Sequence, residues 1–240
     1  MNNQIKYSLA GFCMGVAELI PGISGATVAV IFKIYPNLMI ILSHLRFKNL
    51  TLNLRSLSKT FQFNVSLPLI FSMLIAVIIC SKGINYLLIN HEELFLSSLG
   101  FLMILLAIHI INYFKNVFED KRLAIFLFLG VLIGLFLQEL NISSGNTSMF
   151  YIFMSGILAF SFFLIPGISG SAMLVVLGVY GPVIQAVAML DFGLLIPFAV
   201  GCLISLLLLP KAILSIYSSH EHNLMHIFSG LIISSGIFLL

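Results

Sequence analysis

The pentapeptide Pro-Gly-Ile-Ser-Gly occurs twice, at 21–25 and 166–170, each time within a strongly apolar stretch. Its proline lacks an N–H and its first glycine tolerates backbone angles that other residues avoid, so each copy predicts a break in a helix. We expect a new helix to begin at or just after Ser24 and Ser169. The first N–H groups of a helix have no intrahelical partner and carry a partial positive charge, so both starts could bind an anion.

Hydroxyl-bearing and small residues at the two breaks are the candidate contacts for such an anion. They are Ser24, Gly25 and Thr27 in the first copy, and Ser169, Gly170 and Ser171 in the second. Phosphate is a natural ligand because its oxygens can accept several N–H bonds at once, and glycine lets it approach the backbone closely. The breaks themselves are expected at Pro21, Gly22, Pro166 and Gly167. Small residues at helix breaks also allow close helix packing, which is the alternative interpretation.

Charged residues within apolar segments are the other candidates for chemistry. Glu18 lies just before the first pentapeptide, where a carboxylate is costly unless it is paired or protonated. It could carry a coupling proton, or it could accept hydrogen bonds from the free N–H groups of its own helix break. Lys82 and Lys211 end equivalent predicted helices. Each could attract a phosphate headgroup, or could extend its ammonium group to the membrane surface.

The composition places these residues in a membrane protein. The chain has 240 residues, of which 60% are hydrophobic and 8% charged, and its mean hydropathy is +1.17. Soluble domains carry roughly 25% charged residues, so most of this surface is expected to face lipid. The histidines at 220, 222 and 226 lack the context of a metal motif, and no nucleic-acid signature is present. We therefore expect no metal, no cofactor and no nucleic-acid partner.

Hydropathy predicts an all-α integral membrane protein that forms a single domain over 1–240. The predicted helices are 5–20, 24–42, 65–88, 94–114, 123–140, 149–165, 170–188, 193–212 and 223–240, with a basic stretch at 44–61. With an offset of 145 residues, Gly11 matches Gly156 and Tyr35 matches Tyr180. The chain therefore divides into repeat 1 (about 5–114), a linking helix (about 123–140) and repeat 2 (about 149–240). Each repeat is predicted to be a re-entrant, broken-helix hairpin followed by two transmembrane helices.

Counting membrane crossings makes the second repeat inverted relative to the first, which is a common architecture of secondary transporters. In this arrangement nine of the eleven basic residues face one side, which the positive-inside rule assigns to the cytoplasm. They are Lys6, Arg46, Lys48, Arg55, Lys59, Lys115, Lys121, Arg122 and Lys211. The expected topology has a cytoplasmic N-terminus and an external C-terminus. The basic stretch could anchor the inner face, or could recruit an anionic lipid.

Two motifs together resemble the bacterial polyprenyl-phosphate transporter family, which was long a family of unknown function. The first runs from Gly15 to Thr27 and is followed by Ile34-Tyr35. The second is Pro166-Gly-Ile-Ser-Gly-Ser171, followed by Leu177-Gly-Val-Tyr180. The resemblance spans nearly the whole chain. It departs from the family at Glu18, where aspartate is more frequent, and at Lys33, where glycine is usual.

The resemblance implies a flippase that returns undecaprenyl phosphate from the outer to the inner leaflet of the bacterial cytoplasmic membrane. The lipid would then serve again as a carrier for peptidoglycan and other envelope glycans. The break residues given above would hold the phosphate, and Glu18 could couple transport to the proton gradient. The lipid would be the partner, the protein would not be an enzyme, and association of two copies is left open.

Two alternatives belong to other functional classes. Membrane phosphatases of undecaprenyl diphosphate also combine Pro-Gly-x-Ser with re-entrant helices, but they place an arginine after the serine, where this chain has Gly25 and Gly170. Phosphate release by the purified protein would favour this enzyme. A small-anion channel or exporter could also use helix ends alone. Anion flux in liposomes free of polyprenyl lipid would favour that function.

Overall fold

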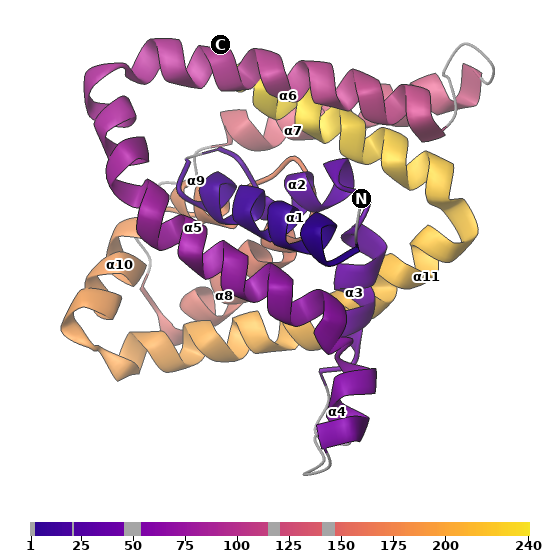
Figure 1. The fold of residues 1–240 in the computed structure, drawn as a ribbon. Helices are drawn as coiled ribbons and strands as arrows, with labels where there is room; N and C mark the ends of the chain where they lie inside the picture. Colours follow the sequence, from indigo (N-terminus) through magenta and orange to yellow (C-terminus); the bar gives the residue numbers. More distant parts are fainter. Residues whose placement is uncertain (1–2, 21, 46–53, 115–120, 141–146) are drawn as a thin grey trace.

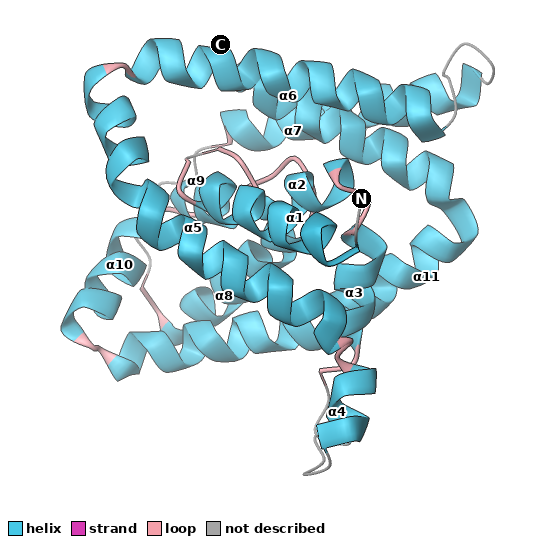
Figure 2. Ribbon diagram, viewed as in Figure 1, coloured by secondary structure: helices cyan, strands magenta, loops and turns pink. Residues whose placement is uncertain are grey.

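The computed structural model describes residues 3–20, 22–45, 54–114, 121–140 and 147–240, and all regular elements in these ranges are helices (Figures 1 and 2). This confirms the predicted all-α fold. The helices are α1 (Asn3–Glu18), α2 (Gly25–Ile31), α3 (Tyr35–Ser43), α4 (Leu54–Thr60), α5 (Phe63–Asn90), α6 (Glu92–Phe114), α7 (Lys121–Glu139), α8 (Met149–Leu164), α9 (Gly170–Val176), α10 (Tyr180–Met189) and α11 (Phe192–Phe238). Pro21 and residues 46–53 of the basic stretch lie outside the described residues.

Four helices, α5, α6, α7 and α11, are long and apolar enough to cross a membrane, and the bent pair α9–α10 would make a fifth span. The chain is therefore a multi-pass membrane protein. The predicted spans 193–212 and 223–240 are joined in α11, whose 47 residues reach about 70 Å, more than twice a hydrocarbon core. The expected loop between them is absent, and a kink at His220 (φ −140°, ψ 44°) joins the two parts instead.

The predictions of single helices at 24–42 and 170–188 are wrong, because a further break divides each into two shorter helices. The breaks lie between α2 and α3 and between α9 and α10, where Lys33 (φ 56°) and Gly178 (φ 69°) are left-handed. In both, the N–H of the left-handed residue bonds to the carbonyl three residues back, and the next N–H to the carbonyl five back. This pattern is a Schellman helix end. Gly178 signalled it in the sequence, but the lysine at the matching position did not.

The two halves of the chain use the same close helix contacts. α1 packs along α5, and α8 packs along the first part of α11. A Cβ at Gly11 would overlap the carbonyl oxygen of Leu69, and a Cβ at Gly156 would overlap that of Phe198. Glycine therefore allows the helix backbones to touch at both matched positions.

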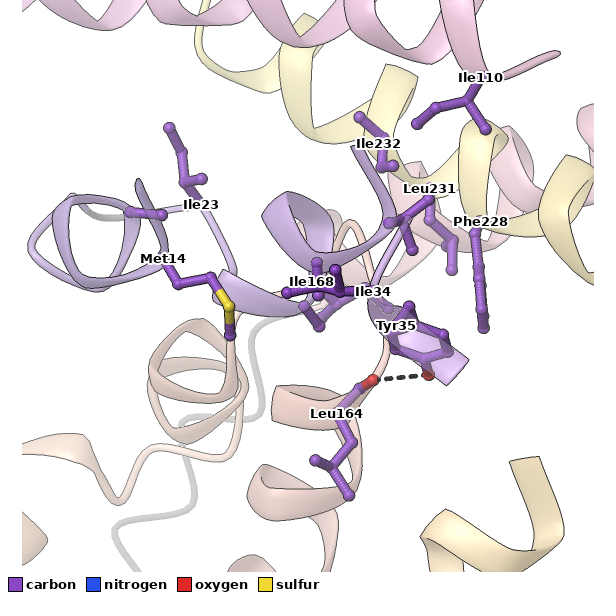
Figure 3. Packing of buried hydrophobic residues seen from close by; sticks show 14 of the residues in the cluster. Met14, Ile23, Ile34, Tyr35, Ile110, Leu164, Ile168, Phe228, Leu231 and Ile232 are labelled. Carbon is purple, nitrogen blue, oxygen red and sulfur yellow. Dashed lines mark hydrogen bonds between the residues drawn. The ribbon is translucent and has the colours of Figure 1, made fainter. Parts of the chain in front are cut away.

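Short helices occupy the centre of the molecule and long helices surround them. In Figure 1, α1, α2 and α9 lie inside a frame made by α5, α6 and α11. The core beneath them includes Tyr35, whose ring packs edge-on against Phe228 with centroids 5.4 Å apart (Figure 3). The broken helices thus pack against an apolar core that the long helices share.

Candidate functional site

Both pentapeptides form breaks of the same local shape. Gly22 (φ 84°) and Gly167 (φ 86°) both adopt positive φ, which favours glycine. The next residue in each copy donates its N–H to a carbonyl three residues back, at 3.3 and 3.4 Å. Each break then leads into a seven-residue helix, α2 or α9. Both glycines lie between two helices, and Figure 2 shows these connections as short loops at the centre of the fold.

The N–H groups of Gly25, Ala26 and Thr27, which start the helix after the first break, all have acceptors. The Ser24 hydroxyl caps α2 by accepting a hydrogen bond from the N–H of Ala26 at 3.2 Å. The Glu18 carboxylate accepts from the N–H of Gly25 at 2.8 Å. A Cβ at Gly25 would lie 2.6 Å from that carboxylate oxygen, so glycine is what permits the approach. Of the two roles considered for Glu18, binding its own helix break is the one formed here.

The second break is open where the first is filled. Phe163 stands at the position equivalent to Glu18, so no carboxylate reaches this helix start. The Ser169 hydroxyl does not cap α9, because it pairs with the hydroxyl of Ser171 at 2.7 Å. The N–H groups of Gly170, Ser171 and Ala172 have no acceptor among the described residues. The two copies of one sequence therefore differ in what they can still bind.

The two breaks contact one another through Gly167. Its N–H donates to the Thr27 hydroxyl at 2.8 Å, and its carbonyl accepts from the Ser235 hydroxyl on α11. Nearby, the Tyr35 hydroxyl donates to the Leu164 carbonyl at 2.9 Å, the bond drawn in Figure 3. Elements from both halves and the final helix thus converge on the second break.

A cavity of about 750 Å³ lies against this junction. Its polar lining residues are Glu18, Gln138, Ser169, Ser171, Tyr180 and Ser235. Most of the remaining wall is apolar, including Leu96, Val175 and Phe238. No lysine, arginine or histidine lines it among the described residues. A site of this kind can bind a polar headgroup through hydrogen bonds while its apolar wall accommodates hydrocarbon.

Sequence reasoning missed Gln138, Tyr180 and Ser235 as cavity residues. Gln138 carried a usable signal, because a lone amide near the end of an apolar span is costly in lipid and tends to face the protein interior. Tyr180 and Ser235 gave no such signal. Only the folded chain brings the ends of α7 and α11 beside the second break.

Several predicted contact residues lie off the cavity in this conformation. Ser24 and Thr27 are buried, and neither they nor Gly25 and Gly170 line the cavity. Lys82 is exposed and borders a separate, shallower cleft that includes Leu19. Lys211 is half-buried on α11 and also lies outside the cavity lining. Their roles in binding remain predictions.

Comparisons with known proteins agree with the motif resemblance. The family model described as undecaprenyl phosphate translocase-like matches residues 14–239. A polyprenyl-phosphate transporter of Vibrio cholerae is 28% identical over 211 residues, which cover 85% of this chain and 67% of that protein. A polyprenyl-phosphate transporter of Staphylococcus aureus is 30% identical over 210 residues, covering 80% of this chain and 70% of that protein. No solved structure matches the chain.

Proposed function

Because the chain belongs to the undecaprenyl phosphate translocase-like family, we propose that it is a flippase for undecaprenyl phosphate. It returns the lipid from the outer to the inner leaflet of the bacterial cytoplasmic membrane, where the lipid is reused in peptidoglycan and other envelope glycan synthesis. The observation that carries the proposal is the central cavity, whose polar groups meet at a helix break and whose other walls are apolar. That combination suits a phosphate attached to a hydrocarbon chain.

The second break holds the phosphate in this conformation. Ser169 and Ser171 line the cavity, and the N–H groups of Gly170, Ser171 and Ala172 are unoccupied among the described residues. Hydrogen bonds from backbone N–H groups can bind an anion even where no cationic side chain contacts it. Ser24, Gly25 and Thr27 of the first break contact the phosphate in another conformation, after Glu18 has released the N–H of Gly25.

The polyprenyl tail stays in lipid while the headgroup crosses. Val175 and Phe238 line the cavity and are also largely exposed, so the apolar wall is continuous with the lipid-facing surface. A hydrocarbon chain that never leaves an apolar environment adds little to the barrier of transport. The protein has only to provide a polar route for the phosphate.

We propose that the two repeats are inverted and that the hairpins are re-entrant. Matched glycine conformations, matched Schellman ends and matched helix contacts support a duplicated unit. The distribution of basic residues supports a cytoplasmic N-terminus and an external C-terminus. Repeats of opposite orientation allow alternating access, because each half can adopt the conformation that the other half now has.

The tyrosines at matching positions suggest how the two conformations differ. Tyr35 is buried and donates to the carbonyl of Leu164. Tyr180 is 43% exposed, lines the cavity and has no hydrogen-bond partner among the described residues. The carbonyl matched to Leu164 is that of Leu19, which borders the same cavity. In the alternate state Tyr180 bonds to Leu19 and Tyr35 releases Leu164, so that the cavity opens to the opposite side.

Glu18 couples this exchange to protons in the proposal. When protonated it no longer offers a charged acceptor to the N–H of Gly25, which frees the first break for the phosphate. Lys82 and Lys211 attract the headgroup at the two membrane surfaces, and the basic stretch recruits anionic lipid at the inner face. The protein acts on a lipid phosphate without breaking a covalent bond, so we propose no enzymatic activity.

Reconstitution in vesicles tests the function directly. Purified protein should move undecaprenyl phosphate between leaflets, measured as the fraction of phosphate accessible to an external modifying reagent over time. Inorganic phosphate release from undecaprenyl diphosphate would instead support the phosphatase. Anion flux in vesicles without polyprenyl lipid would support the channel. In cells, loss of the protein should raise the undecaprenyl phosphate accessible at the surface, and an unchanged level would contradict the proposal.

A further inference from the structure

Gln138 is a polar side chain of the cavity that the proposed transport scheme does not use. Gln138 lies at the end of the linking helix α7 and lines the cavity. Its side-chain carbonyl oxygen is buried and has no hydrogen-bond partner among the described residues. Leaving a buried acceptor unpaired costs on the order of a hydrogen bond, so such an oxygen needs an explanation.

The neighbouring hydrogen bonds fix which end of the amide is unpaired. The Ser235 hydroxyl donates its single proton to the Gly167 carbonyl. Towards Gln138 this hydroxyl can therefore only accept, and it accepts from the side-chain N–H₂ at 3.5 Å. If the Gln138 amide were flipped, its carbonyl oxygen would face the Ser235 hydroxyl oxygen, and neither could donate a proton to the other. The carbonyl oxygen of Gln138 is thus the unpaired end. Its last side-chain torsion is broad and soft, so the oxygen can turn toward the cavity at the expense of the long, 3.5 Å contact with Ser235.

Hydrogen-bond donors and acceptors are separated within the cavity. Tyr180 and the Ser169–Ser171 hydroxyl pair lie on the α9–α10 side and retain protons to donate. Glu18 on α1 and Gln138 on α7 provide acceptors. Glu18 and Tyr180 are the titratable groups on the described lining. A ligand that fits both sides has to carry acceptor oxygens together with at least one O–H donor.

We propose that Gln138 is a specificity-determining residue that accepts a hydrogen bond from the P–O–H group of a singly protonated phosphate. The inference rests on the proposed function and identifies the protonation state of the transported headgroup. A phosphate monoester has its second pKa near 6 and so carries this proton in part at neutral pH. A sulfate monoester has the same tetrahedral shape and a single negative charge but no proton to donate. Gln138 therefore separates phosphate from sulfate by chemistry and not by size.

The experiment compares two lipids with the same polyprenyl chain, one ending in phosphate and the other in sulfate. The full chain is reconstituted in vesicles, and leaflet exchange of each lipid is measured. We expect wild type to move the phosphate at least about ten-fold faster, because a hydrogen bond to a charged group contributes that much or more. Gln138→Met keeps the side-chain length without the amide and should lower the phosphate-to-sulfate ratio about ten-fold. Gln185→Met, at an exposed glutamine of α10 outside the cavity, should leave the ratio unchanged.

Each outcome separates this inference from the proposed function. A wild-type ratio near one overturns the inference while transport of the phosphate lipid stands. No movement of either lipid means that the proposed function itself fails. If Gln138→Met leaves the phosphate-to-sulfate ratio unchanged, another residue discriminates between the two lipids and the inference is overturned. If the methionine variant does not fold, Gln138→Asn gives the same comparison, because it withdraws the amide by one methylene.

Discussion

Replacing Thr27 with valine would leave the N–H of Gly167 without its acceptor. The bond is 2.8 Å long, and the Thr27 side chain is only 1% exposed, so water cannot take its place. Valine has nearly the same shape as threonine, so the change removes the hydrogen bond without creating a large cavity. Measured hydrogen bonds between helices in membranes average about 0.6 kcal/mol and reach about 1.7 kcal/mol. An orphaned buried N–H costs about 1–3 kcal/mol. We therefore expect the free energy of unfolding to fall by about 1–2 kcal/mol.

Two measurements on the purified protein check this value. For a chain of this size, 1–2 kcal/mol corresponds to a melting temperature lower by about 2–8 °C. The same loss should make the Gly167 amide exchange with deuterium about 5- to 30-fold faster, read from a peptide that spans the second break. Thr27→Ser keeps the hydroxyl and loses one methyl group, so it should reduce stability slightly without exposing this amide. If serine accelerates exchange at Gly167 as much as valine does, Thr27 does not hold the two breaks together as described.

Three further predictions follow from other contacts. Glu18→Gln replaces a charged acceptor of the Gly25 N–H with a neutral one, a loss of about 1 kcal/mol, so its melting temperature should fall by about 2–4 °C. Its transport in vesicles should no longer respond to a pH gradient, and a persisting response would remove Glu18 from coupling. Tyr35→Phe should lower the free energy of unfolding by about 1 kcal/mol, because it removes a buried hydrogen bond. Tyr180→Phe should slow transport without changing stability. If both variants lowered the melting temperature equally, the proposed exchange would be contradicted. Gly156→Ala should lower the free energy of unfolding by about 1–3 kcal/mol, because the new methyl group overlaps a facing backbone carbonyl. Gly181→Ala has open space around it and should leave the stability unchanged or raise it in a thermal unfolding assay.

The sequence was sufficient for the class of fold and for the positions of the breaks. Apolar runs predicted the spans, and the repeated pentapeptide predicted left-handed glycines at Gly22 and Gly167. The second break was missed in both halves: Gly178 signalled it in the second, but in the first Lys33 is left-handed without being glycine, at a local cost of about 1 kcal/mol that tertiary packing outweighs. The missing loop in α11 has a similar origin. Polar residues around His220 read as a loop, but helical hydrogen bonding resumes directly after the kink.

The candidate site was predictable in its location but not in its occupancy. Identical pentapeptides implied equivalent anion sites, yet Glu18 fills one and Phe163 leaves the other open. That difference comes from a residue outside the motif, and its effect depends on a side chain folding back across a turn. Gln138 and Ser235 come from helices far along the chain, so only tertiary structure brings them to the cavity.

The peptide unit of Gly167 is held on one side by Thr27 and on the other by Ser235. During synthesis, the first of these partners enters the bilayer long before Gly167, and the second only after nearly all of α11 has been made. Between the synthesis of residues 167 and 235, the peptide unit of Gly167 therefore lacks one of its two hydrogen-bond partners. Completion of this junction is thus coupled to arrival of the final helix, and a chain stalled before residue 235 would lack it.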